Sequence, residues 1–259
     1  MPKEANPALG WRGIRVTLQW KDLLRVQLRA ALRASAHGDL RLLFPMITTL
    51  DEVLEIKETI EELRAQLLEQ GYEIADKISI GIMIEVPSAV FTLKQMIEEI
   101  DFVSVGTNDM VQYLLAADRD NPFVGNLYDP HQPAVIEALR QVAQIANEAG
   151  KPCSVCGEMA GEHMNALLLM GMGYDALSVA PNFISEVKYA VRRTTTQAAK
   201  EIFREVSLER SGAGVRQVLQ EAGARLMEIT TAELIQERPS LGGSPGEQIG
   251  REKEGPGAR

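Results

Sequence analysis

The sequence lacks the features that mark several special classes of protein. Two cysteines in 259 residues are too few for a disulfide scaffold. No apolar run approaches the roughly 20 residues that are needed to span a bilayer. The first residues also lack the apolar segment of a secretion signal. We therefore expect a soluble, cytoplasmic protein with no membrane partner.

Basic charge is also scarce. The chain has 27 Lys and Arg against 36 Asp and Glu, which gives a formal charge of −9. Binding to nucleic acid needs a basic face that neutralises phosphates, so no nucleic-acid partner is expected. A local cationic pocket for a small anion remains compatible with this balance. Hydrophobic residues make up 45% of the chain, which is enough for a sizeable core.

Short apolar runs alternate with segments of helical periodicity along most of the chain. We predict six strands, over residues 13–18, 40–47, 78–85, 102–107, 152–157 and 176–180. Helices are predicted over residues 21–36, 49–71, 87–100, 109–117, 133–149, 165–172, 185–193, 197–206 and 215–235. Thr49 and Glu52 have the spacing of a capping box. Strands that alternate with helices predict a parallel α/β sheet.

Polar residues gather where the predicted strands end, at Glu85, at 107–109 and at 156–158. In a (β/α)₈ TIM barrel, this rim carries the chemistry. We predict such a barrel in incomplete form over residues 1–238, with about six of the eight strands and without the first two. Residues 239–259 are rich in Gly, Pro and charge and predict a disordered polar tail.

Two carboxylates at neighbouring strand ends are candidate metal ligands. Glu85 closes a buried apolar strand, where a carboxylate is costly unless it is paired or bound to a metal. The alternative is a solvated Glu at the strand end. Asp109 closes the next strand, and neighbouring strands lie about 4.8 Å apart, so the two carboxylates could share Mg²⁺. Asn108 and Asp109 could equally cap a helix, whose first N–H groups would bind an anion.

Three arginines are candidates for binding an anionic substrate. Arg119 lies between two Asp residues and forms either a surface ion pair with one of them or a guanidinium fork for a substrate carboxylate. Arg12 and Arg15 flank the first predicted strand at an odd separation, so at most one faces a pocket easily. A surface role is the alternative for either of these two.

Cys153 and Cys156 form a C-x-x-C pair, which can indicate a redox or zinc site. Zinc would need two more ligands, and the three histidines do not have ligand spacing. On a strand, a separation of three places the two thiols on opposite faces. One thiol would then face the barrel lumen or rim as a candidate proton donor, with an ordinary pKa of about 8.5. A buried structural Cys is the alternative.

Six motifs, in this order, resemble enzyme I of the bacterial phosphotransferase system, the phosphoenolpyruvate–protein phosphotransferases. They are residues 10–15 (Gly-Trp-Arg-Gly-Ile-Arg), 44–47 (Phe-Pro-Met-Ile), 83–89 (Met-Ile-Glu-Val-Pro-Ser-Ala), 105–109 (Val-Gly-Thr-Asn-Asp), 118–119 (Asp-Arg) and 156–160 (Cys-Gly-Glu-Met-Ala). The first motif is similar to the nitrogen-related form. Pyruvate phosphate dikinase and phosphoenolpyruvate synthase share versions of several motifs and remain alternatives, as does a metal-dependent lyase.

The resemblance covers residues 2–194 and implies a phosphoenolpyruvate-binding barrel. It implies that Glu85 and Asp109 hold Mg²⁺. It implies that the backbone at Asn108 and Asp109, together with Arg119, binds the substrate carboxylate. Arg12 would assist at the phosphoryl group. These roles suit the substrate, because a molecule with two anionic groups needs a metal, helix-start amides and guanidinium forks.

The resemblance further implies that Cys156 protonates the enolate that phosphoryl transfer leaves behind, a step that needs an acid placed near carbon. It also implies a cytoplasmic transferase of sugar transport or its nitrogen branch, which acts as a homodimer on a small phosphocarrier protein.

The chain also departs from the family pattern. Enzyme I carries a domain with a phospho-accepting His and a helical domain that docks the carrier before this region. Its first two barrel strands also precede this region and bring two arginines that grip the phosphoryl group. His37 lacks the family's Gly-Ser/Thr-His context. We therefore expect transfer to a protein histidine only together with such parts, and none by this chain alone. A non-catalytic module for phosphoenolpyruvate binding or dimerisation is the alternative.

Overall fold

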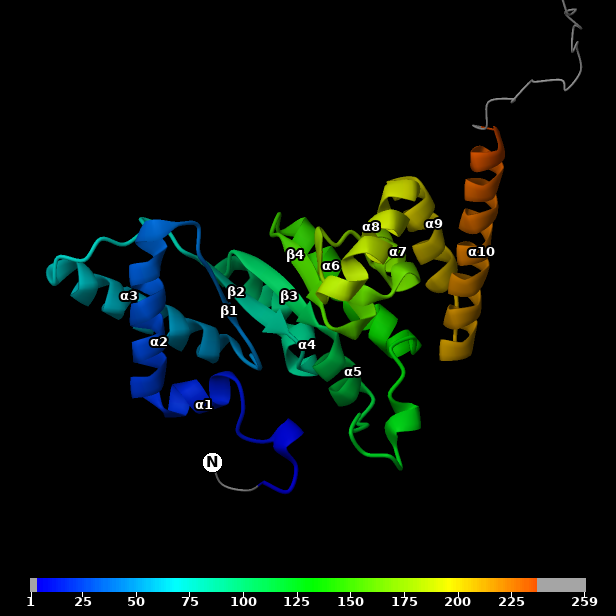
Figure 1. The fold of residues 1–259 in the computed structure, drawn as a ribbon. Coiled ribbons are helices and arrows are strands. Elements are labelled where there is room, and N and C mark those ends of the chain that lie inside the picture. The colour runs from blue at the N-terminus through cyan, green and yellow to red at the C-terminus, as the bar shows by residue number, and fades with distance from the viewer. Residues whose placement is uncertain (1–3, 237–259) are drawn as a thin grey trace, which may run out of the picture.

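A parallel five-stranded sheet forms the centre of the computed structural model, which describes residues 4–236 (Figure 1). Its strands are β1 (Arg41–Phe44), β2 (Ser79–Ile84), β3 (Phe102–Gly106), β4 (Cys153–Cys156) and β5 (Ala176–Ser178). Each strand pairs in parallel with the next one along the chain. The tail predicted over 239–259 lies outside the described residues.

The strand order is compatible with part of a barrel wall. Doubly wound sheets reverse their strand order at a switch point, whereas the strands of a (β/α)₈ barrel follow one another around the axis. The order β1-β2-β3-β4-β5 contains no reversal. The predicted parallel α/β architecture is therefore confirmed. The sheet remains open, as a partial barrel requires.

The first predicted strand is wrong. Residues 13–18 lie mostly in helix α1 (Ile14–Gln19), so the described chain has five strands, and an eight-stranded barrel would need three more rather than two. Apolar residues at 14, 16 and 18 fit a period of two, but Ile14 and Leu18 also fit one face of a helix. Gly13, with φ of +56°, turns the chain before the helix, and the Ile14 N–H donates to the Pro45 carbonyl at 3.2 Å.

The predicted helices are all present, with small shifts at their ends. They are α2 (Lys21–Ala34), α3 (Leu50–Glu69), α4 (Pro87–Met96), α5 (Thr107–Leu114), α6 (Pro133–Glu148), α7 (His163–Met172), α8 (Ile184–Arg193), α9 (Thr196–Val206) and α10 (Gly212–Gln236). The capping box between Thr49 and Glu52 forms as predicted. Helix α5 begins two residues early, so Asn108 and Asp109 lie in its first turn and Gly106 is the capping residue.

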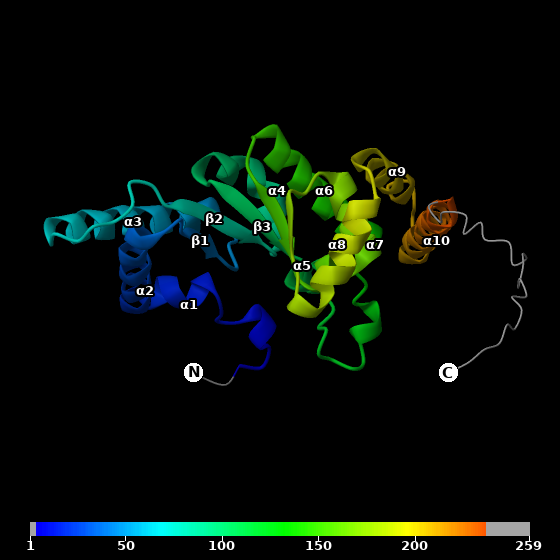
Figure 2. The same ribbon diagram turned by 45° about the horizontal axis from the view of Figure 1, so that its top comes forward.

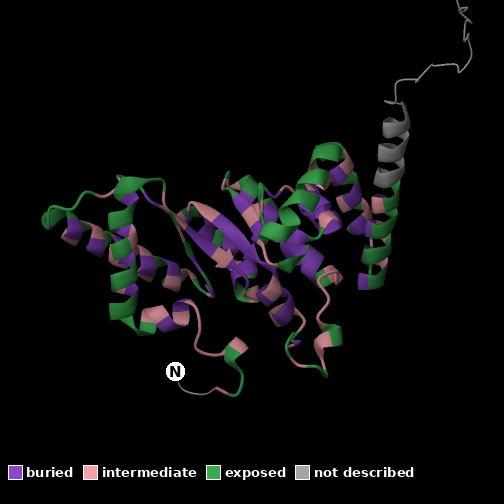
Figure 3. Ribbon diagram, in the orientation of Figure 1, coloured by how far each residue is buried: buried purple, intermediate pink, exposed green. Residues whose placement is uncertain are grey.

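The two faces of the sheet differ in what covers them. On one face, Ile82, Val103 and Val155 are fully buried, and helices pack over it, with α4 on β2 and α6 on β3 and β4; Figure 3 shows the buried strands. The alternate positions on the other face carry Ser104 and Ser154 as well as the larger Met83 and Phe102. In a completed barrel this second face would line the lumen.

The last two helices extend the fold beyond the sheet (Figure 2). Helix α9 packs on α7, and α10 packs on α9. Each helix within the described residues is too short or too polar to cross a membrane.

Candidate functional site

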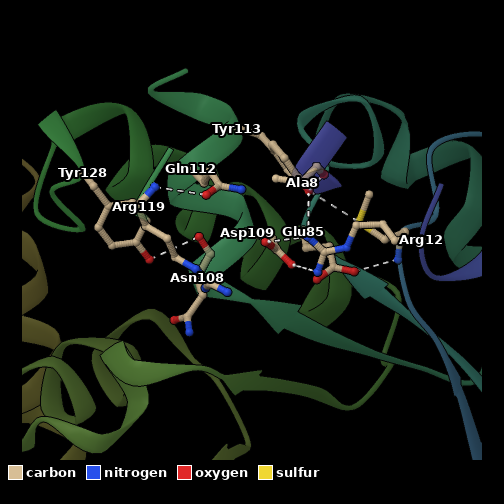
Figure 4. Close-up of polar contacts among 10 residues, drawn as sticks. Ala8, Arg12, Glu85, Asn108, Asp109, Gln112, Tyr113, Arg119 and Tyr128 are labelled. Atoms are coloured by element: carbon tan, nitrogen blue, oxygen red, sulfur yellow. Dashed lines mark hydrogen bonds and ion pairs between the residues drawn. The ribbon is translucent and has the colours of Figure 1, made fainter. Parts of the chain in front are cut away.

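Two buried carboxylates meet at the carboxyl ends of β2 and β3 (Figure 4). Glu85 directly follows β2, and Asp109 lies in the first turn of α5, which follows β3 without a loop. Their residues are 4% and 8% exposed. The Asp109 carboxylate lies near enough to contribute to the raised pKa of Glu85. The structure thus brings together the pair that the sequence suggested as metal ligands.

The surroundings of Glu85 favour its protonated form. Burial raises the pKa of Glu85 to about 7, the Met46 N–H opposes this shift, and the Asp109 carboxylate adds to it. The Met46 N–H donates to Glu85 Oε1 at 2.6 Å, from a residue with φ of +64°. A methyl group at Gly106 would lie 2.8 Å from Glu85 Oε2, so the glycine makes room for this carboxylate.

Arg12 pairs with the second carboxylate. Its Nη2 lies 3.0 Å from Asp109 Oδ2 and its Nη1 lies 3.5 Å from Asp109 Oδ1, while Nη1 also meets the Tyr113 hydroxyl at 3.4 Å. Arg15 instead donates to two backbone carbonyls of the preceding turn. Of the two arginines, therefore, Arg12 joins the carboxylate pair, as the odd spacing allowed. The sequence did not indicate that its partner would be a predicted metal ligand.

Asn108 joins the loops that follow β3 and β4. Its side-chain Oδ1 accepts the Glu158 N–H at 3.0 Å, and its backbone carbonyl accepts the Tyr128 hydroxyl at 3.2 Å. A methyl group at Gly157 would lie 2.8 Å from that Oδ1. The side chain is thus used within the protein. The backbone N–H groups of the first turn of α5, which have no acceptor within a helix, remain the groups that can meet an anion.

Arg119 lies in the loop between α5 and α6 and is exposed. Its backbone N–H donates to Gln112 Oε1 at 3.1 Å, and its guanidinium lies against the Tyr128 hydroxyl (Figure 4). No ion pair joins Arg119 to Asp118 or Asp120, all three being described residues. The surface ion-pair alternative is therefore absent here.

Tyr128 is a site residue that the sequence reasoning missed. Burial raises the pKa of its hydroxyl, and the neighbouring Arg119 opposes this shift. The residue stands in a polar loop between Leu127 and Asp129. A lone aromatic side chain with a polar tip in such a loop was the available signal.

Cys156 lies on the same face of β4 as Ser154, whereas Cys153 is buried on the helix-covered face at 1% exposure. The Cys156 thiol donates to the Val105 carbonyl at 3.3 Å and accepts from the Ser104 hydroxyl at 3.8 Å. Burial raises the pKa of Cys156, and the Glu85 carboxylate adds to the rise. The thiol therefore carries its proton at neutral pH.

The carboxylate pair fits Mg²⁺. This ion usually takes one or two protein carboxylates and fills its other positions with water and substrate oxygens. Glu85 and Asp109 with Arg12 leave one net negative charge when both acids are ionised. Burial is the main cause of the raised pKa of Glu85, and a cation would relieve the repulsion by Asp109 that adds to it. Within the described residues, no group of three or more His, Cys, Asp or Glu forms a cage for a metal held by protein alone.

Residues 1–196 match the family model described as PEP-utilising enzyme, PEP-binding domain. Two relatives, both named phosphoenolpyruvate-protein phosphotransferase, are similar to the chain. The relative from Haemophilus influenzae is 42% identical over 221 residues, which are 85% of this chain and 38% of the relative. The relative from Lactococcus lactis is 41% identical over 204 residues, which are 78% of this chain and 36% of the relative. The chain thus spans little more than a third of the length of these relatives.

A solved structure described as a citrate lyase from Burkholderia xenovorans LB400 has a similar fold. Its TM-score is 0.50 at 20% identity, and the match covers 80% of this chain and 69% of that one. At this identity the likeness concerns the fold alone.

Proposed function

Because the chain belongs to the family of PEP-utilising enzymes and matches their PEP-binding domain, we propose that it holds Mg²⁺ and phosphoenolpyruvate for phosphoryl transfer to a protein histidine. The observation that carries the proposal is the meeting of Glu85 and Asp109 at one rim of the sheet. The names of the similar relatives support the reaction.

Glu85 and Asp109 would hold the metal. When bound, Mg²⁺ would supply positive charge that neutralises the phosphoryl group, which is the main requirement of phosphoryl transfer. Arg12 pairs with the Asp109 carboxylate and would supply a second positive charge to the phosphoryl group. The negative charge of the phosphate would then be neutralised by Mg²⁺ and Arg12 together.

The substrate carboxylate would bind on the other side of the site. Arg119 would offer its guanidinium, and the first-turn N–H groups at Asn108 and Asp109 would offer the positive end of α5. Tyr128 contacts the side chain of Arg119, and Gln112 accepts its backbone N–H, so the two residues hold Arg119 in place.

Cys156 would complete the reaction. Loss of the phosphoryl group leaves the enolate of pyruvate, which becomes pyruvate when its methylene carbon gains a proton. The thiol holds that proton at neutral pH because burial raises its pKa. The thiolate that remains would take a proton back from water.

The phosphoryl acceptor would be a histidine other than the three histidines of this chain. His37 lies before β1, at the opposite ends of the strands, and His131 and His163 are hydrogen-bonded to other side chains. We therefore propose that this chain does not phosphorylate itself. The phosphocarrier partner, the homodimer and the nitrogen-related form stay predictions from the sequence motifs.

Proton exchange on pyruvate tests the proposal without a phosphoryl acceptor. The chain with Mg²⁺ should exchange the methyl protons of pyruvate with deuterium from D₂O, because removing a methyl proton is the reverse of the proposed protonation. Cys156→Ser should lower this rate by about a hundred- to ten-thousandfold, the usual contribution of a general acid or base. Cys153→Ala, on the opposite face of the strand, is the matched control.

Calorimetry with Mg²⁺ and phosphoenolpyruvate distinguishes the outcomes. Binding without proton exchange would support a non-catalytic binding module. Absence of both binding and exchange would contradict the proposed function.

A further inference from the structure

Asp129 is held at the start of the C-terminal helix. Its Oδ2 accepts from Arg216 Nη1 at 2.7 Å and from Gln132 Nε2 at 3.0 Å, and its Oδ1 accepts the His131 N–H at 3.0 Å. Gly212, the first residue of α10, lies against the same carboxylate, since a methyl group there would overlap Asp129 Oδ2 unless that side chain moved. The Asp129 side chain is 14% exposed. A loop carboxylate is thus enclosed by two groups of α10.

A second anchor joins the same loop to α7. His131 Nε2 lies 3.0 Å from Asn165 Oδ1, and Asn165 Nδ2 donates to Glu162 Oε2 at 2.7 Å. A carboxylate only accepts, so the Asn165 amide nitrogen must face Glu162 and its oxygen must face His131. Asn165 is 1% exposed, so this contact is buried.

The residue before Asp129 reaches the proposed substrate site. The Tyr128 hydroxyl donates to the Asn108 carbonyl at 3.2 Å and meets the Arg119 guanidinium (Figure 4). It therefore stands between the anchored end of the loop and the two groups proposed to bind the substrate carboxylate.

The middle of the loop has little packing of its own. Phe123 is 89% exposed and Leu127 is 55% exposed. A segment with so few buried apolar contacts is held in place by its anchors. Arg119 lies at the start of the loop, where Gln112 holds its backbone, while its side chain meets Tyr128 at the end of the loop.

We infer that α10 acts as a clamp on the substrate loop, in which Arg216 holds Asp129 and thereby fixes Tyr128 as a positioning residue for Arg119. This inference rests on the proposed function. It assigns a role in ligand affinity to a helix far from the carboxylate pair.

Calorimetry with two ligands tests the clamp. Phosphoenolpyruvate carries the carboxylate, and vinyl phosphate is the same enol phosphate without it. With Mg²⁺ present, Tyr128→Phe and Arg216→Ala should each weaken phosphoenolpyruvate binding about tenfold and leave vinyl phosphate binding within twofold. Arg216→Lys should restore most of the lost affinity. Arg225→Ala, which removes the exposed ion pair of the same helix with Glu205, should change neither.

A double-mutant cycle identifies the group through which Tyr128 acts. In the Arg119→Ala background, Tyr128→Phe should cause no further loss of phosphoenolpyruvate affinity. Independent, additive losses would overturn the positioning role. An equal loss for both ligands would overturn it too, because a general structural effect does not discriminate the carboxylate.

Hydrogen exchange decides the clamp independently of ligand binding. Amides of residues 118–132 should exchange at least tenfold faster in Arg216→Ala than in the wild type, and not in Arg225→Ala. Unchanged exchange would overturn the clamp. If the wild-type chain binds neither ligand, the proposed function fails, while this measurement still decides whether α10 holds the loop.

Discussion

The two halves of the candidate site are held by different forces. In one half, the buried carboxylates of Glu85 and Asp109 repel each other, and the Arg12 guanidinium pairs with Asp109. In the other half, Asn108 and Tyr128 are held by hydrogen bonds between neutral groups. Charge that is removed from water responds strongly to protons and cations, whereas neutral hydrogen bonds do not. The first half should therefore sense pH and metal, and the second should set geometry.

The largest expected effect comes from removing a charge in the first half. Asp109→Asn should weaken binding of Mg²⁺ and phosphoenolpyruvate about a thousandfold, or about 4 kcal/mol, because a metal ligand is lost and Arg12 loses its partner. Calorimetry measures this affinity. Glu158→Gln, which removes an exposed carboxylate from the same rim, should be within twofold of wild type. An affinity loss below tenfold for Asp109→Asn would argue against a metal site at this pair.

A second test of the charged half uses stability and pH. The pKa of Glu85 rises from 4.5 to about 7 on folding. The folded chain therefore favours the protonated acid: no penalty exists below pH 4.5, it grows between pH 4.5 and 7, and it is complete above pH 7. Glu85→Gln keeps an acceptor for the Met46 N–H and removes the charge. It should stabilise the metal-free chain by about 3 kcal/mol above pH 7.

Urea unfolding of both proteins as a function of pH measures this difference. The two stabilities should converge as the pH falls toward 4.5. A constant difference across this range, or a less stable variant at pH 8, would contradict the raised pKa.

A glycine substitution tests how tightly the charged half is packed. Gly106→Ala would place a methyl group 2.8 Å from Glu85 Oε2 and 3.0 Å from Met83 Sδ. Overpacking of this kind costs about 2 kcal/mol, which thermal unfolding can measure. Gly38→Ala is the control, since nothing lies within 4 Å of that position. Equal effects of the two substitutions would show that Glu85 moves freely.

The smallest effect is expected in the neutral half. Asn108→Ala removes the acceptor of the Glu158 N–H and should cost about 1 kcal/mol of stability, as a single neutral hydrogen bond does. The loss should be the same at pH 5 and pH 8. A pH-dependent loss, measured by urea unfolding, would erase the distinction between the two halves.

The sequence predicted what depends on local pattern and on strand order. Consecutive parallel strands bring their carboxyl ends to one rim, which was enough to place Glu85 beside Asp109. The capping box at Thr49 needs only the residues around it. Cys153 and Cys156 fell on opposite faces because a strand alternates.

Contacts between distant segments could not be predicted in this way. Arg12 and Asp109 are 97 residues apart, and nothing near either residue indicates the other. The Met46 N–H, which binds Glu85, has no signature in the sequence because it is a backbone group in an unusual conformation. The prediction of a strand over residues 13–18 was wrong because the apolar pattern of six residues fits both a strand and a helix. The hydrogen bond from the Ile14 N–H to the distant Pro45 carbonyl, where the helix begins, has no local signature.

The uneven side chains on one face of the sheet have a consequence for any attempt to complete the barrel. Interiors of such barrels are filled by side chains from alternate strands, mostly bulky and branched ones. Here that face carries Gly81, Ser104 and Ser154 beside Met83 and Phe102, and a methyl group at Gly81 would overlap the Phe102 ring. Strands added by genetic fusion or as a separate peptide would have to place large residues against the two serines and small ones against Phe102.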